Sequence, residues 1–239
     1  MLTHHDADPA FQSPSLACDA HFHVFGPAER YPYAGGLRYT PPVAELSDYL
    51  GLAELLGMKR FVFVQPSAYG RDNSCMFDAM RQMDPSLRRA IVDVDEHISD
   101  AELVTMNELG VRGVRINVSP VHPYEEGLLE HMLPRIQRLD ARCAELGWHL
   151  DFLLPGWLTH KMLPTLAKLK VDHSLAHMGM FLGAKGPQQD GFTQLLDLLK
   201  TALAKPGSNS LEPTAWPRRP HSPMHCPWPK PSWVWPKTG

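Results

Sequence analysis

The sequence lacks the features that identify several classes of protein. Its net charge is −3 and its pI is about 6.5, which excludes the broad basic surface of a nucleic-acid-binding protein. No segment approaches the roughly 18 consecutive apolar residues that a membrane helix requires. The first residues show no basic start followed by an apolar stretch, so we expect no secretory signal. We therefore expect a cytoplasmic protein without a nucleic-acid or membrane partner.

Cysteine is scarce, and its positions exclude two further classes. Cys18, Cys75, Cys143 and Cys226 are irregularly spaced and form no C-x-x-C pair. This spacing argues against a zinc knot and a disulfide framework, and it is typical of proteins from a reducing compartment. The chain has 239 residues, of which 44% are hydrophobic, so it can bury one sizeable core.

Proline, in contrast, is abundant and unevenly distributed. Nine of the 23 prolines and four of the six tryptophans fall within residues 205–239. Proline at this density blocks helix interiors and central strands. We therefore divide the chain into a flexible start (1–16), a patterned body (17–203) and an irregular tail (204–239), which we expect to be disordered.

The patterned body alternates between short apolar runs and segments with helical periodicity. Ser99 and Glu102 form a capping-box sequence, which predicts a helix that ends before Gly110. The predicted strands are 17–25, 60–65, 88–94, 111–118, 148–154 and one within 171–179. The predicted helices are 43–57, 73–83, 99–109, 125–146, 158–169 and 192–200.

Strict alternation of strands and helices predicts a parallel sheet, and two architectures meet this prediction. One is an open doubly wound sheet, and the other is a (β/α)8 barrel. The first strand is followed by neither G-x-G-x-x-G nor a P-loop, so a nucleotide-binding doubly wound sheet would lack its phosphate site. Barrels carry their chemistry at the C-terminal ends of the strands, where this chain has its unusual polar residues. We therefore predict a TIM-barrel type α/β fold, incomplete with about six βα units.

The first predicted strand carries two histidines. His21 and His23 are two residues apart, so the strand period places both on one face. Two imidazoles that converge inside a barrel can bind a metal or polarise a carbonyl group. The alternative is a solvent-facing pair on an edge strand, but the segment D-A-H-F-H-V-F favours a functional pair.

Several segments together resemble a known family. DAHFHVFGP, RYTPP, FVFVQPSAYGRDN, VRGVRINV and LAHMG occur in this order over residues 17–200. They resemble the amidohydrolase-related (amidohydrolase 2) barrels, and most of all the lactonases similar to 2-pyrone-4,6-dicarboxylate hydrolase. The resemblance implies a hydrolase that acts on a small carboxylate-bearing lactone or a related carbonyl compound. A decarboxylase of the same superfamily is the alternative.

The resemblance also implies roles for individual residues, three in catalysis and three in substrate binding. The catalytic residues would be His21, His23 and His177, and the substrate-binding residues would be Tyr39, Ser67 and Arg115. The histidines would polarise the lactone carbonyl with or without a divalent metal, zinc or manganese, which His21 and His23 would hold. An arginine suits a carboxylate because its planar guanidinium group forms two parallel hydrogen bonds.

Three further positions, Val121, His149 and Asp151, bear on the substrate and on the barrel interior. The pyrone-dicarboxylate hydrolases carry a second arginine where this chain has Val121, which favours another lactone or carbonyl acid as substrate. His149 and Asp151 alternate on the fifth predicted strand, and either could face the barrel interior or the surface. The oligomeric state is left open.

The family's general base is missing from the sequence. Relatives carry an aspartate in G-T-D-W-P-H or G-S-D-Y-P-H at the eighth strand, and a seventh strand similar to W-V-K-L-S-G-x-Y-R; neither occurs here. Codons read one base out of frame over 204–220 can encode ETWVKLTGTYRMATAP, so we interpret the tail as a frameshift product. A proline-rich docking segment is the alternative. We expect a barrel without these strands to expose strand edges and to be inactive.

Overall fold

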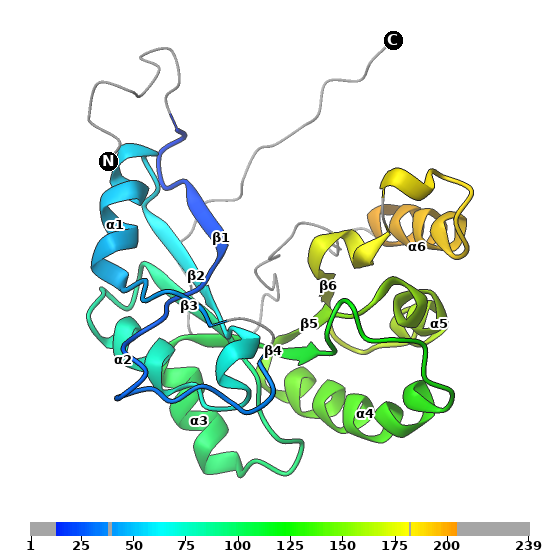
Figure 1. The fold of residues 1–239 in the computed structure, drawn as a ribbon, viewed down its shortest axis with the longest axis horizontal. Coiled ribbons are helices and arrows are strands. Elements are labelled where there is room, and N and C mark those ends of the chain that lie inside the picture. Colours follow the sequence, from blue (N-terminus) through cyan, green and yellow to red (C-terminus); the bar gives the residue numbers. More distant parts are fainter. Residues whose placement is uncertain (1–12, 38–39, 182, 205–239) are drawn as a thin grey trace.

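The computed structural model describes residues 13–37, 40–181 and 183–204 (Figure 1). The predictions for the irregular tail, for most of the flexible start and for Tyr39 concern residues outside this description. In the described part, Ser13 Oγ donates a hydrogen bond to the Leu56 carbonyl oxygen at 2.5 Å.

Six parallel strands form a single sheet, and their order in the sheet is their order along the chain. They are β1 (Cys18–Phe22), β2 (Arg60–Val64), β3 (Arg88–Val92), β4 (Val111–Asn117), β5 (His149–Leu153) and β6 (His173–Leu175). A sequential parallel order is that of a barrel, whereas a doubly wound sheet reverses at a switch point. Figure 1 shows the sheet curling from β1 to β6. The prediction of an incomplete TIM barrel is confirmed.

Helices follow the strands and cover the outer face of the curled sheet (Figure 1). They are α1 (Leu46–Leu55), α2 (Ser74–Arg81), α3 (Asp100–Leu109), α4 (Leu128–Leu146), α5 (Gly156–Leu166) and α6 (Phe192–Ala204). Three short 3-10 helices are η1 (Ser67–Tyr69), η2 (Ala176–Met180) and η3 (Gly183–Lys185). In the described residues, no helix combines the length and apolar character needed to cross a membrane.

Local signals explain where the helices begin and end. The predicted capping box precedes α3: Glu102 N donates to Ser99 Oγ at 3.2 Å, and Ser99 N donates to Glu102 Oε2 at 3.0 Å. Gly110 ends α3 with φ of 114°, a backbone conformation that residues other than glycine rarely adopt. The helix predicted over 125–146 begins only at Leu128, because Gly127 before it has φ of 79°.

The two faces of the sheet bury different side chains. On the outer face, Phe63 and Phe152 are fully buried in the large core that also contains Ile136 of α4. On the inner face, Val62 and Val64 form a small second cluster, which Ile91 and Cys18 complete. Burial of apolar area on the outer face is therefore the main source of stability, and the inner face has room for polar side chains beside its small apolar cluster.

β1 contains an irregularity in its pairing with β2. Asp19 pairs with Phe61, but Phe22 rather than the residue before it pairs with Phe63. One extra residue is therefore inserted between these pairs, which is a β-bulge. The bulge reverses the inward and outward alternation of side chains in the second half of β1.

Candidate active site

The bulge in β1 decides where the two histidines point. Phe22 stacks on Tyr49 of α1 with ring centroids 4.1 Å apart, so its side chain lies on the outer face. Its neighbours His21 and His23 consequently lie on the inner face, with ring centroids 5.1 Å apart and planes at 80°. Cys18 packs on the inner face, and in a regular strand Phe22, four residues later, would lie on that same face. The bulge between them moves Phe22 to the outer face and the two histidines to the inner face.

His23 has a defined protonation state. Its Nδ1 lies 2.8 Å from the Val64 carbonyl oxygen, and a carbonyl oxygen can only accept a hydrogen bond, so Nδ1 carries the proton. Burial lowers the pKa of His23 from 6.5 to about 4, although the bond to Val64 opposes this shift. His23 is therefore neutral at pH 7, and its Nε2 has a free lone pair.

His21 is more exposed than His23 and lies close to several charged groups. Partial burial lowers its pKa, and the charges of Arg115 and His177 lower it further, while Asp151 opposes them. His21 and His23 thus lie together on the inner face, and His177 follows β6 at the carboxyl end of the sheet. A neutral His21 retains one N–H group that can donate to a substrate oxygen.

His177 lies directly after β6, in η2, and its side chain is exposed. Its backbone φ is 51°, and the next residue, Met178, has φ of 52°. Two consecutive non-glycine residues in the left-handed region are uncommon and cost energy. Such strain is frequent where a backbone holds a functional side chain in position.

Arg115 is buried on the inner face at the border between β4 and β5. Only 2% of its surface is exposed. Its Nη1 donates to the Gln65 carbonyl oxygen at 3.1 Å, and its Nε lies 3.3 Å from Asp151 Oδ2. Burial lowers the pKa of Arg115, although Asp151 and Asp93 oppose this shift. The guanidinium group remains charged, because its ordinary pKa is far above neutral pH.

Asp151 connects Arg115 to the next strand. In the sheet Arg115 is paired with Asp151, which in turn is paired with Ser174 of β6. Ser174 Oγ donates to Asp151 Oδ1 at 2.5 Å. The sequence left the direction of Asp151 open and did not identify Ser174 or Gln65. The signal for Gln65 is a polar residue at the end of an apolar strand, whereas nothing in the sequence distinguishes Ser174.

His149 also faces inward, one layer below Arg115. It is buried, and burial lowers the pKa of its ring. The ring packs directly over Gly113, where a Cβ atom would lie 2.7 Å from His149 Cε1. Glycine at this position therefore makes room for the imidazole.

Of the other two predicted substrate-binding residues, the structure describes Ser67 but not Tyr39. Ser67 begins η1 just beyond the end of β2, and its side chain is exposed. Tyr39 lies outside the described residues. Arg112, which is an odd number of residues from Arg115, donates to the Asn107 carbonyl oxygen at 2.8 Å and is structural.

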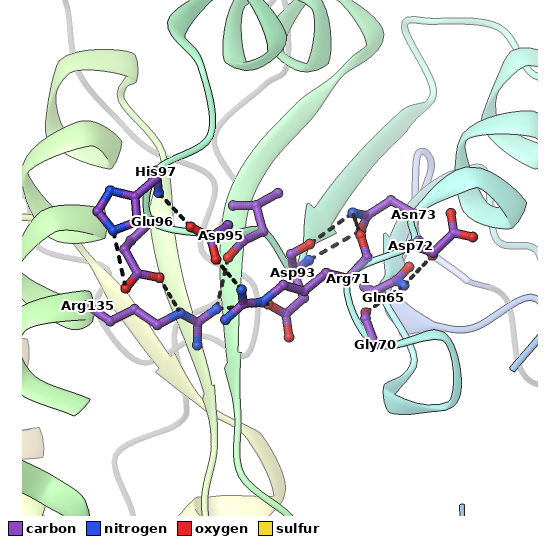
Figure 2. Close-up of polar contacts among 11 residues, drawn as sticks. Gln65, Gly70, Arg71, Asp72, Asn73, Asp93, Asp95, Glu96, His97 and Arg135 are labelled. Carbon is purple, nitrogen blue, oxygen red and sulfur yellow. Dashed lines mark hydrogen bonds and ion pairs between the residues drawn. The ribbon is translucent and has the colours of Figure 1, made fainter. Parts of the chain in front are cut away.

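A network of ion pairs and hydrogen bonds fixes the loops that follow β2 and β3 (Figure 2). Asp93 lies just after β3, and its carboxylate accepts a hydrogen bond from Arg135 of α4 at 2.9 Å. Its backbone carbonyl oxygen accepts a second hydrogen bond, from Asn73 Nδ2, at 2.9 Å. Arg71 lies 3.7 Å from the same carboxylate. Gln65 Nε2 donates to the Asp72 carbonyl oxygen at 2.8 Å. The loops after β2 and β3 are thereby held against α4.

A surface hollow of about 490 Å³ lies between residues 96–100 and α4, on the helix side of the sheet. Its cationic groups are already engaged, because Arg142 pairs with Asp100 at 2.5 Å and Arg138 contacts the ring of His97 at 3.0 Å. Because its lining residues belong to α4 and to residues 96–100, the hollow is a different site from the one that contains the inner-face histidines and Arg115.

The described residues do not form a metal site. His21 and His23 supply two imidazoles, but zinc and manganese sites usually need three or four protein ligands. No group of three or more His, Cys, Asp or Glu side chains with suitable geometry occurs in the described residues. Cys18, Cys75 and Cys143 are free.

Comparisons with known proteins agree with this architecture. The chain is 32% identical to 4-sulfomuconolactone hydrolase from Hydrogenophaga intermedia over 197 residues, which are 82% of this chain and 63% of the relative. It is 32% identical to 2-pyrone-4,6-dicarboxylate hydrolase from Comamonas testosteroni over 194 residues, 80% of this chain and 61% of the relative. The chain thus spans about three fifths of the length of these curated relatives.

A solved structure from Pseudomonas putida, described as that of a candidate 2-pyrone-4,6-dicarboxylic acid hydrolase, superposes with a TM-score of 0.65 at 30% identity. The superposition covers 78% of this chain and 66% of that one. Residues 18–203 match the family described as amidohydrolase, and this range contains all six strands. The chain therefore belongs to the amidohydrolase family.

Proposed function

We propose that this chain forms the substrate-binding part of a hydrolase that opens an anionic lactone. The observation that carries the proposal is the placement of buried Arg115 on the same inner face as His21 and His23. His23 Nδ1 donates to the Val64 carbonyl oxygen, and Arg115 Nη1 donates to the carbonyl oxygen of the next residue, Gln65, so both side chains lie at the carboxyl end of β2. A substrate carboxylate bound to Arg115 would therefore place an adjoining ring against the two imidazoles.

The two histidines serve different purposes in this proposal. His21 donates its N–H to the lactone carbonyl oxygen and polarises it. His23 cannot donate in the same way, because its Nδ1–H already donates to the Val64 carbonyl oxygen, so its Nε2 accepts a hydrogen bond from water or from the substrate. Water adds to the carbonyl carbon, the ring C–O bond breaks, and a hydroxy acid forms.

The curated relatives support the substrate class. Both are named as hydrolases, one of a sulfomuconolactone and one of a pyrone dicarboxylate, and each name describes a lactone with anionic groups. A basic side chain in a low-dielectric environment binds such groups more strongly than it would in bulk water. We therefore infer a small lactone with at least one carboxylate as the substrate.

The test is binding of 2-pyrone-4,6-dicarboxylate and 4-sulfomuconolactone to the full chain, measured by isothermal titration calorimetry, with ring opening followed by ultraviolet absorbance and by proton release. Arg115→Gln should weaken binding by about 10- to 100-fold, because a charge-assisted hydrogen bond contributes about 1.5–3 kcal/mol. His131→Gln, which replaces an exposed histidine of α4, is the matched control and should bind as the wild type does.

Two results would contradict the proposal. Equal binding by wild type and Arg115→Gln would remove Arg115 from the substrate site. Release of CO2 from a carboxylated substrate without ring opening would favour the alternative decarboxylase reaction. Binding without turnover would agree with the expectation that the general base is missing from this sequence.

A further inference from the structure

The ion pair between Arg115 and Asp151 is unusual because it is buried but not hydrogen-bonded. Arg115 Nε and Asp151 Oδ2 are 3.3 Å apart, yet neither atom has a hydrogen-bond partner among the described residues. Both side chains are at most 4% exposed. Poor alignment means that the attraction between them is mainly one of charge, and that the directional donors of Arg115 are only partly used.

The two carboxylates near Arg115 differ in how their charge is balanced. Asp93 is held by Arg135 and Arg71, so its charge is compensated without Arg115. Asp151 has Arg115 as its one ionic partner in the described part of the chain, and the neutral Ser174 hydroxyl as its hydrogen-bond donor. Asp151 is therefore the counter-ion of Arg115.

We propose that Asp151 sets the affinity of the site for the substrate carboxylate, an inference that rests on the proposed function of Arg115. Asp151 neutralises the buried guanidinium group before the substrate arrives, and its misaligned contact leaves the Nε–H of Arg115 without a hydrogen-bond acceptor among the described residues. Its negative charge then repels the bound carboxylate. Ser174 fixes Asp151 in this position and draws part of its charge away from Arg115.

The test is the dissociation constant of isophthalate, measured by isothermal titration calorimetry on the full chain at pH 7.5. This probe carries two carboxylates on a planar ring and has no ester bond to cleave. Asp151→Asn keeps the shape of the side chain and an acceptor for Ser174, but it removes the charge. We expect binding about tenfold tighter than that of the wild type, as for two charges about 6 Å apart in a partly solvated site.

Asp140→Asn is the matched control. Asp140 is also buried, but it lies on α4 and accepts hydrogen bonds from the backbone of Lys170 and Val171. Its replacement should leave the dissociation constant of isophthalate unchanged. Ser174→Ala should weaken binding several-fold, because without this hydrogen bond the full charge of the Asp151 carboxylate acts on Arg115.

The outcomes separate this inference from the proposed function. Loss of binding in Arg115→Gln together with unchanged or weaker binding in Asp151→Asn would overturn the role of Asp151 and retain that of Arg115. Unchanged binding in Arg115→Gln would instead overturn the proposed function. If Asp151→Asn fails to fold by circular dichroism, Ser174→Ala decides, and binding equal to or tighter than that of the wild type overturns the inference.

Discussion

Acid should destabilise the protein through His23, and the size of the effect follows from its surroundings. The unfolded chain binds a proton on this imidazole near pH 6.5, whereas the folded chain binds it only near pH 4. Between these values the unfolded state carries more protons, so the free energy of unfolding falls as the pH falls. The stabilisation is complete above pH 6.5 and is lost progressively toward pH 4.

The magnitude follows from the two pKa values. Between pH 7 and pH 5 the expected loss from His23 is about 2 kcal/mol, and over the whole range it is about 3 kcal/mol. The measurement is urea unfolding of wild type and His23→Gln at both pH values, followed by circular dichroism. Glutamine can still donate to the Val64 carbonyl oxygen, but it cannot be protonated. The variant should therefore lose about 2 kcal/mol less than the wild type between pH 7 and pH 5.

His131→Gln provides the control, because it removes a histidine that is exposed on α4. Its loss of stability between the two pH values should equal that of the wild type. Two other histidines also contribute to the total, since burial of His149 and partial burial of His173 lower their pKa values. The comparison between variants isolates His23. Equal losses in wild type and His23→Gln would refute the reasoning, because His23 would then be as accessible to protons in the folded chain as in the unfolded one.

Three substitutions test the packing, each by the midpoint of urea unfolding. Gly113→Ala should lower the free energy of unfolding by about 1–3 kcal/mol, because its Cβ would overlap the His149 ring. Gly35→Ala, whose added Cβ would have no neighbouring atom within 4 Å, should lower it much less. A small loss in Gly113→Ala would show that His149 packs elsewhere. Ser99→Ala should cost about 1 kcal/mol through loss of the capping box before α3. Ile136→Ala should cost about 2–5 kcal/mol, since this side chain is fully buried; losses below 1 kcal/mol would contradict the described core.

The sequence predicts the strands and helices well because their signals are local. Apolar runs give the six strands, and the capping box at Ser99 and the glycine at 110 give both ends of α3. Helix starts are less certain where the signal is weak, as at α4, whose predicted start includes the turn before Gly127. The alternation of strand and helix predicts a parallel sheet, but the choice of a barrel depends on the missing phosphate-binding motif and on the polar residues at the strand ends.

The direction of individual side chains is less predictable, because it depends on pairing between strands. The strand period places His21 and His23 on one face but does not reveal which face, and the bulge between Asp19 and Phe22 decides it. The contact between Arg115 and Asp151 likewise requires the register of β4 against β5. A single sequence contains no signal for either register.

The most direct test of the central claim is an NMR measurement of the histidine side chains with and without isophthalate. The ring nitrogen resonances of His21 and His23 should shift on addition of the probe, and that of His131 should not, because only the first two lie on the inner face with Arg115. The shifts should disappear in Arg115→Gln. Unshifted His21 and His23 resonances in the wild type, or shifts that persist in Arg115→Gln, would contradict an anion site on the inner face of the sheet.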